Sequence, residues 1–276
     1  MSAPCTRRMR IVLAAALASL AISLAPPSAP AQQPGVSVER VRASIAPTVD
    51  VGDRQITIVR VDLSRYRLRI LTAERHGGPR TVPDWVADHG LGGAINAGMF
   101  LPSGRSVGFM MQDGDVVSNR RVSKYRGVIG FDPRRSSLDP LALGGRGCGP
   151  GIDGMTGRYR NVLQAYRVLD CRGRAVRWPT RKRYSAAAFG IDAEGRAVFV
   201  HSRTPYQMTV FSRMLAEPSL RLRGLIYMEG GPEASLVVNA EGQTVRALGS
   251  YEDGFNPNDD NDEFWEVPNV IAFEAR

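Results

Sequence analysis

Histidine, cysteine and lysine are scarce in this chain of 276 residues, and their scarcity excludes several classes of protein. Neither His76 nor His89 stands at metal-ligand spacing from a Cys, Asp or Glu, so the sequence shows no zinc signature and we expect no metal. The scattered arginines form no patch interleaved with aromatic residues, which argues against a nucleic-acid-binding protein. No apolar run beyond residue 25 is long enough to span a membrane, so we expect no stable span after signal removal.

The first 31 residues have the pattern of a secretory signal peptide. A basic start is followed by the apolar run Ile11–Ala25 and by the small residues of a cleavage site before Gln32. The alternative is an uncleaved N-terminal anchor. Cys5 precedes the apolar run, an order that does not fit a lipoprotein anchor. We therefore expect residues 1–31 to be removed and the protein to be periplasmic or secreted.

The rest of the chain is predicted to form one domain. Residues 32–36 read as a short disordered lead-in, and 37–276 contain neither an internal repeat nor a second linker. The signal carries three of the 36 basic residues and none of the 27 acidic ones, which leaves a net charge of about +6 and suits anionic substrates. Cys148 and Cys171 are an even pair in an exported protein and suggest a disulfide; two free thiols are the alternative.

Strand patterns dominate, and they predict an α+β fold: a single domain with a mixed β-sheet rich in strands and a few flanking helices. The segments 54–63 and 66–71 alternate apolar and polar residues across a short turn, which suggests a hairpin. Further strands are predicted at 127–131, 186–191, 197–202, 225–228, 234–238 and the C-terminus. One helix should begin near Thr81, and a second at Thr204-Pro205 should run to about Glu217 and complete a crossover unit.

Two stretches carry candidate binding residues. Asn96 ends an apolar run and is followed by Ala-Gly; its amide can bind a sugar hydroxyl, or it can cap a turn. Ser202 and Arg203 precede the second predicted helix, where backbone N–H groups and the helix dipole favour a phosphate or carboxylate. The alternative there is an ordinary Thr204 N-cap beside a solvated arginine.

The strongest candidate is the loop after the predicted strand 225–228. Glu229 ends the strand, Gly230 and Gly231 allow a close approach of the backbone to a ligand, and Glu233 supplies a second carboxylate. Paired carboxylates about 5–10 Å apart are typical of glycoside cleavage. Both glutamates could equally be exposed loop charges.

Several motifs in sequence order resemble those of the phosphodiester glycosidase family, which includes the lysosomal uncovering enzyme. They are INAGMF, SVGFMMQDGDVV, LQAYRVLD, AFGIDAEGRAVFVHS, YMEGGPEASLVV and PNVIAF. The resemblance covers residues 56–273, and the chain is similar to a bacterial exported subgroup of the family. It implies a glycosidase in which Glu229 is the principal acid/base group, Glu233 a second carboxylate or an orienting group, and Asn96 and Ser235 hold the sugar or the Glu229 loop.

The sequence departs from the family pattern at two positions. The family's Asp appears as Glu229, and its Arg falls on Ala186, so Arg183 or Arg203 would have to bind the anion. We expect an exported hydrolase that cleaves a sugar-1-phosphodiester in an envelope or extracellular glycan. A non-catalytic envelope protein that binds anionic glycan, and a purely structural envelope protein, are the alternatives.

An acidic segment near the C-terminus could also bind an ion. Asp259 lies in the run NPNDDNDEF (256–264), whose oxygens could hold Ca²⁺, although the spacing is not that of an EF-hand. We expect no cofactor, with calcium near Asp259 as the alternative to a solvated loop.

Overall fold

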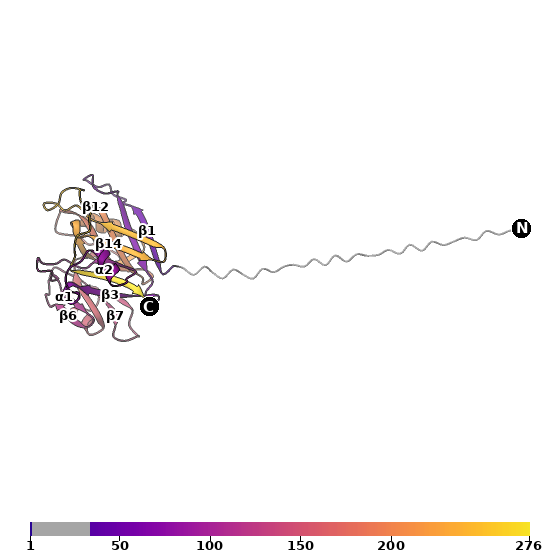
Figure 1. Cartoon of the computed structure of the whole chain (residues 1–276), viewed down its shortest axis with the longest axis horizontal. Helices are drawn as coiled ribbons and strands as arrows, with labels where there is room; N and C mark the ends of the chain where they lie inside the picture. The colour runs from indigo at the N-terminus through magenta and orange to yellow at the C-terminus, as the bar shows by residue number, and fades with distance from the viewer. Residues whose placement is uncertain (2–33) are drawn as a thin grey trace. The chain divides into compact units, whose positions relative to one another are not determined.

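The computed structural model describes Met1 and residues 34–276 (Figure 1). The predicted signal peptide, apart from Met1, and residues 32 and 33 of the lead-in lie outside the described residues. Residues Pro34–Arg276 form one unit by their contacts. None of the helices in the described part of the chain has the length and hydropathy needed to cross a membrane.

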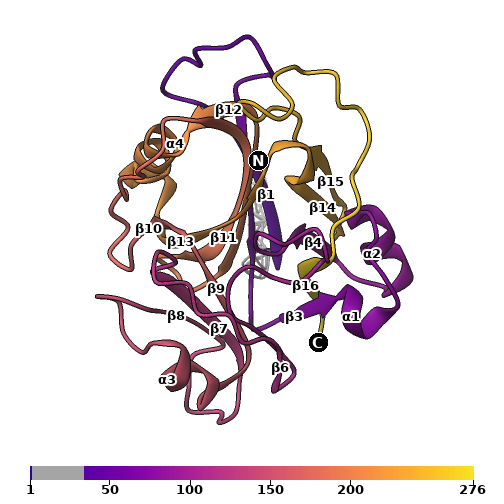
Figure 2. The same ribbon diagram turned by 90° about the vertical axis from the view of Figure 1, so that its left-hand side faces the viewer.

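A six-stranded sheet carries the strand that ends at Glu229. Its order is β1 (Val36–Arg42), β2 (Gln55–Val61), β12 (Ala197–Gln207), β11 (Arg183–Asp192), β13 (Leu222–Gly230) and β10 (Arg167–Leu169). Neighbouring strands are antiparallel. β12 and β13 therefore run in the same direction with β11 between them, and α4 (Met208–Leu215) makes the predicted crossover from one to the other (Figure 2).

Two five-stranded sheets complete the domain. The second sheet has the order β15 (Gln243–Leu248), β14 (Ser235–Ala240), β4 (Gly93–Asn96), β16 (Asn269–Ala275) and β3 (Tyr66–Thr72). The third has the order β6 (Asp115–Ser118), β5 (Met110–Gln112), β9 (Tyr159–Ala165), β7 (Gly127–Pro133) and β8 (Leu141–Gly144). The prediction of a strand-rich α+β fold is confirmed.

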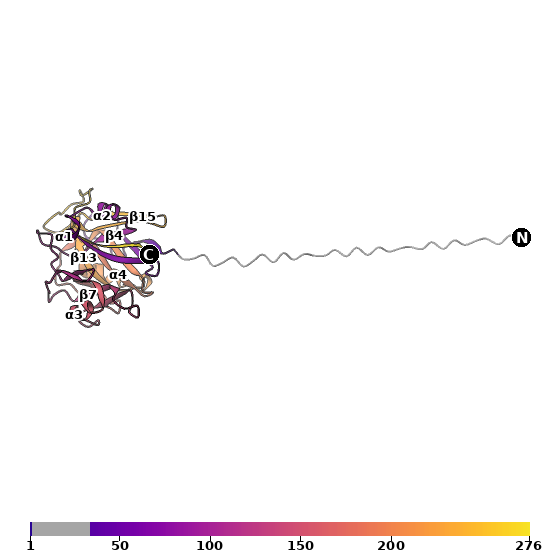
Figure 3. The same cartoon turned by 60° about the horizontal axis from the view of Figure 1, so that its bottom comes forward.

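The helices are short and lie at the margins of the sheets (Figure 3). Besides α4, the α-helices are α1 (Ala73–His76), α2 (Val82–Asp88) and α3 (Ile152–Thr156). Two 3-10 helices, η1 (Pro218–Leu220) and η2 (Gly231–Glu233), flank β13. α2 begins as predicted: Thr81 is its N-cap and accepts the N–H of Asp84, while Trp85 and Val86 are buried. That buried face covers the second sheet.

A chain of phenylalanine rings joins the three sheets. Phe131 of β7 contacts Phe189 of β11 at 6.3 Å between ring centroids, Phe189 contacts Phe199 of β12 at 4.9 Å, and Phe199 contacts Phe273 of β16 at 5.5 Å. All four rings are fully buried. Burial of each stabilises the fold by about 2–3 kcal/mol relative to an exposed ring, so the sheets share one core.

Two predicted local structures are wrong. The segments 54–63 and 66–71 form β2 and β3, but these pair in different sheets rather than as a hairpin. The turn between them keeps Leu63 and Tyr66 buried in the shared core, so burial outweighs local pairing. The second helix begins at Met208 instead of Thr204, because β12 continues to Gln207. Pro205 lies where the β11–β12 register shifts, and a residue without an N–H is tolerated there.

Candidate active site

The loop after β13 places Glu229 at the end of the strand, and its glycines are required by close packing. A Cβ on Gly230 would lie 2.4 Å from the Tyr227 hydroxyl, and Gly231 adopts a left-handed conformation with φ of 69°. The backbone at these glycines therefore comes close to other groups, as predicted, but those groups belong to the protein and not to a ligand. Glu229 is partly exposed, and its Oε1 accepts the N–H of Gly230 at 3.1 Å.

Three carboxyl groups gather around this loop. The position that a Cβ on Gly231 would take lies 3.1 Å from Oε2 of Glu252 and 3.4 Å from Oε2 of Glu233. The negative charges of Glu233 and Glu252 both act on Glu229. The structure therefore joins the predicted pair Glu229 and Glu233 and adds Glu252, which the sequence analysis missed. Glu252 follows β15 in an irregular segment, so no local pattern indicated it.

The cluster holds protons more tightly than ordinary carboxyl groups. Burial raises the pKa of Glu229 to about 8, with contributions from the charges of Glu233 and Glu252; hydrogen bonds from Gly230 and Tyr227 oppose the shift. Burial also raises the pKa of Glu233 and that of Glu252. At neutral pH Glu229 is therefore mostly protonated and can donate a proton.

A row of aromatic rings begins at the Glu229 carboxyl group. Tyr227 hydrogen-bonds to it, and burial raises the pKa of Tyr227 well above its ordinary value, so the hydroxyl keeps its proton. From Tyr227 the rings continue to Trp178 at 5.3 Å, from Trp178 to Tyr166 at 4.8 Å, and from Tyr166 to Tyr125 at 4.4 Å between centroids. Burial, with the charges of Tyr166 and Glu229, raises the pKa of Tyr125 to about 12.

Asn96 and Ser235 are joined by a hydrogen bond beside the loop. Asn96 Oδ1 accepts the backbone N–H of Ser235 at 3.0 Å, which ties the end of β4 to the start of β14. Both side chains are buried. Asn96 Nδ2 and Ser235 Oγ make no hydrogen bond in the protein. A buried polar group without a partner is rare, because it costs stability, so these two atoms mark the end of β4 and the start of β14 as unusual.

His201, which lies in β12, supports the same loop. Its Nε2–H donates to the carbonyl oxygen of Ala234 at 3.0 Å. Burial lowers the pKa of His201 to about 4, although the Ala234 carbonyl acts in the opposite direction. The ring is therefore neutral at physiological pH and serves as a fixed donor to the loop. The sequence analysis gave this residue no role.

The predicted anion site at Ser202 and Arg203 is wrong in its geometry. Both residues lie within β12, so they are not at a helix start, and the Ser202 hydroxyl donates to Thr204 O at 2.8 Å. The Arg203 guanidinium binds Asp259, at 2.7 Å from Nε to Oδ1, and donates to three backbone carbonyl oxygens. Arg183, the other candidate, binds the carboxylate of Asp253 through Nε and Nη2. Neither guanidinium is free to replace an arginine at Ala186.

Asp259, where calcium was considered, is engaged with the protein. Its Oδ1 accepts from Arg203 and its Oδ2 accepts the N–H of Gly52 at 3.0 Å. Within residues 34–276, no three His, Cys, Asp or Glu side chains are grouped in a way that could hold a metal ion.

The sequence matches the phosphodiester glycosidase family over residues 89–274, about two thirds of the chain, a span that contains the whole carboxyl cluster. The chain belongs to the phosphodiester glycosidase family. No protein of curated function matches it at a significant level. The recognition of the family from its motifs is confirmed, and the protein is a glycosidase that acts on a sugar-containing substrate.

Two solved structures resemble this phosphodiester glycosidase. One is the catalytic domain of zebrafish N-acetylglucosamine-1-phosphodiester alpha-N-acetylglucosaminidase, auto-inhibited by its pro-peptide; the identity is 16%, the TM-score 0.63, and the match covers 89% of this chain and 85% of that one. The other is a hypothetical protein from Synechocystis, with 15% identity, a TM-score of 0.62, and coverage of 88% and 62%. At these identities the likeness supports the fold.

Proposed function

We propose that this glycosidase is an exported hydrolase that cleaves a sugar-1-phosphodiester in a cell-envelope or extracellular glycan, with Glu229 as its general acid. The observation that carries the proposal is the raised pKa of Glu229, about 8, within a group of three carboxyl groups. An acid that keeps its proton at neutral pH and a neighbouring base are the two groups that glycoside hydrolysis needs.

The proposed reaction breaks the bond between the anomeric carbon and the phosphodiester oxygen. Glu229 donates its proton to that oxygen as the bond breaks. A water molecule forms the new bond to the anomeric carbon, and the carboxylate of Glu233 accepts the proton that the water loses. The products are the free sugar and a phosphate monoester, so atoms and protons balance. The side-chain amide of Asn96 and the hydroxyl of Ser235 bind sugar hydroxyls.

Proton retention also explains how an acidic loop can accept an anionic substrate. Three ionised carboxylates would repel a phosphodiester, because like charges interact strongly where burial lowers the effective dielectric constant. The proton that Glu229 keeps at neutral pH removes one of these three charges. The Tyr227 hydroxyl, which keeps its proton, can stabilise negative charge on Glu229 as the proton leaves.

Two features support export. The N-terminal pattern is that of a secretory signal peptide, and Cys148 and Cys171 form a disulfide, which persists in oxidising compartments. The predicted mature protein begins at Gln32. Mass measurement of the protein after expression in a secreting host tests this directly, and an intact N-terminus would contradict it.

Turnover of sugar 1-phosphodiesters is the decisive experiment. The purified protein is incubated with a panel of N-acetylglucosamine and other sugar 1-phosphodiesters, and the released sugar is quantified. We expect release by the wild type and a decrease in kcat of about 100-fold or more in Glu229→Gln, because the proton donor is lost. Glu263→Gln, which changes an exposed glutamate away from the cluster, is the matched control.

The outcomes separate the candidate functions. Full activity of Glu229→Gln would overturn the assignment of the acid. Saturable binding of the same compounds without release would favour the alternative, a protein that binds anionic glycan, for which the paired state of Arg183 and Arg203 would then need an explanation.

A further inference from the structure

A cavity of about 620 Å³ lies beside the rings of Tyr166 and Trp178, and the proposed chemistry does not use it. Four of its lining residues are basic: Lys124, Arg126, Arg167 and Arg177. None of its lining residues, all from the described part of the chain, is acidic. Its remaining surface comes from Tyr166, Trp178 and small apolar side chains. The cavity therefore combines an apolar wall with a positive rim.

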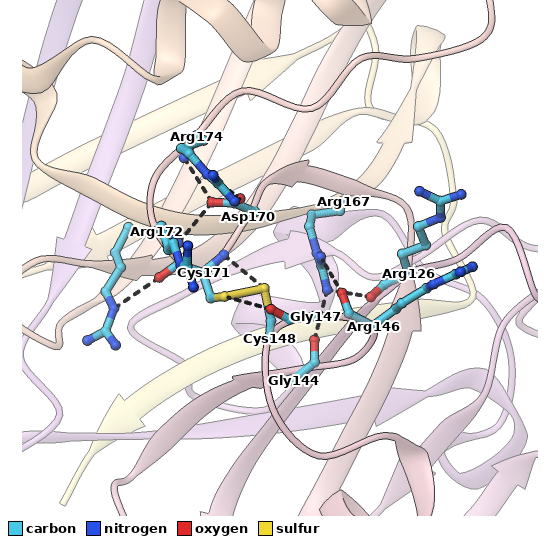
Figure 4. The surroundings of a disulfide bond; sticks show 11 residues. Arg126, Gly144, Arg146, Gly147, Cys148, Arg167, Asp170, Cys171, Arg172 and Arg174 are labelled. Atoms are coloured by element: carbon cyan, nitrogen blue, oxygen red, sulfur yellow. Dashed lines mark hydrogen bonds and ion pairs between the residues drawn. A yellow bond between two sulfur atoms is a disulfide. The ribbon is translucent and has the colours of Figure 1, made fainter.

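Arg167 is built into the wall, whereas the other three cations project from exposed positions. Its Nη2 donates to Arg126 O at 2.6 Å and to Gly144 O at 3.2 Å, and its Nη1 donates to Arg146 O at 3.0 Å (Figure 4). Burial lowers the pKa of Arg167, and the charge of Asp170 acts in the opposite direction. Arg167 thus fixes the backbone of the wall through its hydrogen bonds, and the three exposed cations remain for a ligand.

The three exposed cations are free of acidic partners within residues 34–276. The side chains of Lys124, Arg126 and Arg177 form no salt bridge there, whereas Arg183 and Arg203 do. Cations that face one cavity without a counter-ion repel one another, and a bound anion relieves this repulsion. Phosphate and carboxylate groups are the usual partners of such arginines.

The aromatic wall connects this cavity with Glu229. Trp178 is held by two hydrogen bonds, from its Nε1–H to Arg167 O at 3.1 Å and from its N–H to Thr209 Oγ1 at 3.0 Å. Its other neighbour is Tyr227, which bonds to Glu229. Tyr166 and Trp178 therefore lie between the positive rim and Tyr227, the hydrogen-bond partner of Glu229.

We propose that the cavity is the aglycone subsite: it binds a phosphate group at Lys124, Arg126 and Arg177 and an apolar or planar part of the aglycone against Tyr166 and Trp178. This rests on the proposed function, since the sugar of the same substrate would occupy the Glu229 loop. Because Tyr166 and Trp178 lie between Glu229 and these cations, the phosphate bound here is a second one, distinct from the phosphate that is joined to the sugar. The substrate class is therefore a sugar 1-phosphodiester whose aglycone has an apolar or planar part and a further phosphate group.

Binding of a substrate fragment without a sugar tests the subsite independently of catalysis. The probe is 1-naphthyl phosphate, measured by isothermal titration calorimetry with the full protein, beside octyl phosphate, inorganic phosphate and uncharged 1-naphthol. We expect Arg126→Gln and Arg177→Gln each to weaken naphthyl phosphate binding by about tenfold, since a charge-assisted contact is lost. Trp178→Leu should weaken both organic phosphates but not inorganic phosphate.

Arg158→Gln is the control, because Arg158 is an exposed arginine outside the cavity. Octyl phosphate that binds as well as naphthyl phosphate would indicate a lipid-like aglycone, and preference for the naphthyl compound would indicate a planar one; both support the subsite. Rim variants that bind like Arg158→Gln, or inorganic phosphate that binds as tightly as the organic phosphates, would overturn it.

The two proposals fail in different ways. If sugar phosphodiesters are hydrolysed and the rim variants keep a wild-type KM, the subsite is wrong and the hydrolase assignment stands. If no sugar is released but naphthyl phosphate binding depends on Arg126 and Arg177, the subsite is right and the reaction is wrong.

Discussion

The side-chain oxygen of Asn96 accepts the backbone N–H of Ser235 at 3.0 Å, across 139 residues of sequence. This bond ties two family motifs together beside Glu229. It also leaves the Asn96 amide nitrogen and the Ser235 hydroxyl without partners in the protein. One residue pair therefore fixes the loop and holds the two polar atoms that we propose bind the sugar.

Replacing Asn96 should affect both stability and activity. Asn96→Ala leaves the buried N–H of Ser235 without an acceptor, so we expect a loss of about 1–3 kcal/mol in the free energy of unfolding. Urea unfolding followed by fluorescence measures it. Activity should fall as well, because the loop is no longer held. Unchanged stability would show that the bond does not support the loop.

Ser235→Ala should separate binding from folding. Its hydroxyl makes no bond in the protein, so its removal should leave the free energy of unfolding within about 0.5 kcal/mol of the wild type. If the hydroxyl binds the sugar, KM should rise about fivefold to tenfold, the loss of one hydrogen bond. A wild-type KM would remove Ser235 from the substrate contacts.

The pH profile should report the proton on Glu229. An acid with a pKa of about 8 loses its proton as pH rises through that value, so kcat/KM should fall above pH 8. Glu252→Gln removes a charge that raises this pKa, and the fall should move to lower pH. Tyr227→Phe removes a hydrogen bond that lowers it, and the fall should move to higher pH. Shifts in the same direction for both variants would contradict the assignment.

Stability should depend on pH through the same group. The folded protein keeps the Glu229 proton up to about pH 8, whereas the unfolded chain releases it near 4.5, so the free energy of unfolding decreases as pH rises between these values. Glu229→Gln removes this term. Its stability relative to the wild type should therefore improve by roughly 2–4 kcal/mol from pH 5 to pH 9. An equal difference at both pH values would show that burial of Glu229 does not raise its pKa.

The sequence predicts those features of the fold that depend on residues close together in the chain, and not those that depend on residues far apart in it. The pattern of apolar residues predicted β11, β12 and β13 and the turn between β11 and β12, because each of these features depends on about ten consecutive residues. The pairing of β2 and β3 was not predictable in this way, since the core, and not the turn, assigns each strand to its sheet. The same limit explains Arg203: its partner Asp259 lies 56 residues away.

The site was predicted in part for the same reason. Glu229, Glu233, Asn96 and Ser235 stand in short motifs that can be read locally, and the structure brings them together. Glu252 stands in no such motif. The rings of Tyr125, Tyr166, Trp178 and Tyr227 come from separate strands and loops, so only the folded chain shows that they form one wall.

The disulfide between Cys148 and Cys171 should stabilise both the fold and the proposed subsite. The bond joins the loop after β8 to the end of β10, with a Cα–Cα distance of 5.6 Å, and closes a loop with a sequence separation of 23 (Figure 4).

Closing a loop of this length stabilises a protein by about 3 kcal/mol. The double variant Cys148→Ser/Cys171→Ser should lose that amount in urea unfolding, and dithiothreitol should lower the Tm of the wild type but not of the variant. Gly144 ends β8 and Arg146 lies in the tethered loop, and the carbonyl oxygens of both hold Arg167, so the variant should also bind 1-naphthyl phosphate more weakly. Weaker binding without loss of stability would still tie the disulfide to the cavity, whereas wild-type values of both would show that the bond contributes to neither.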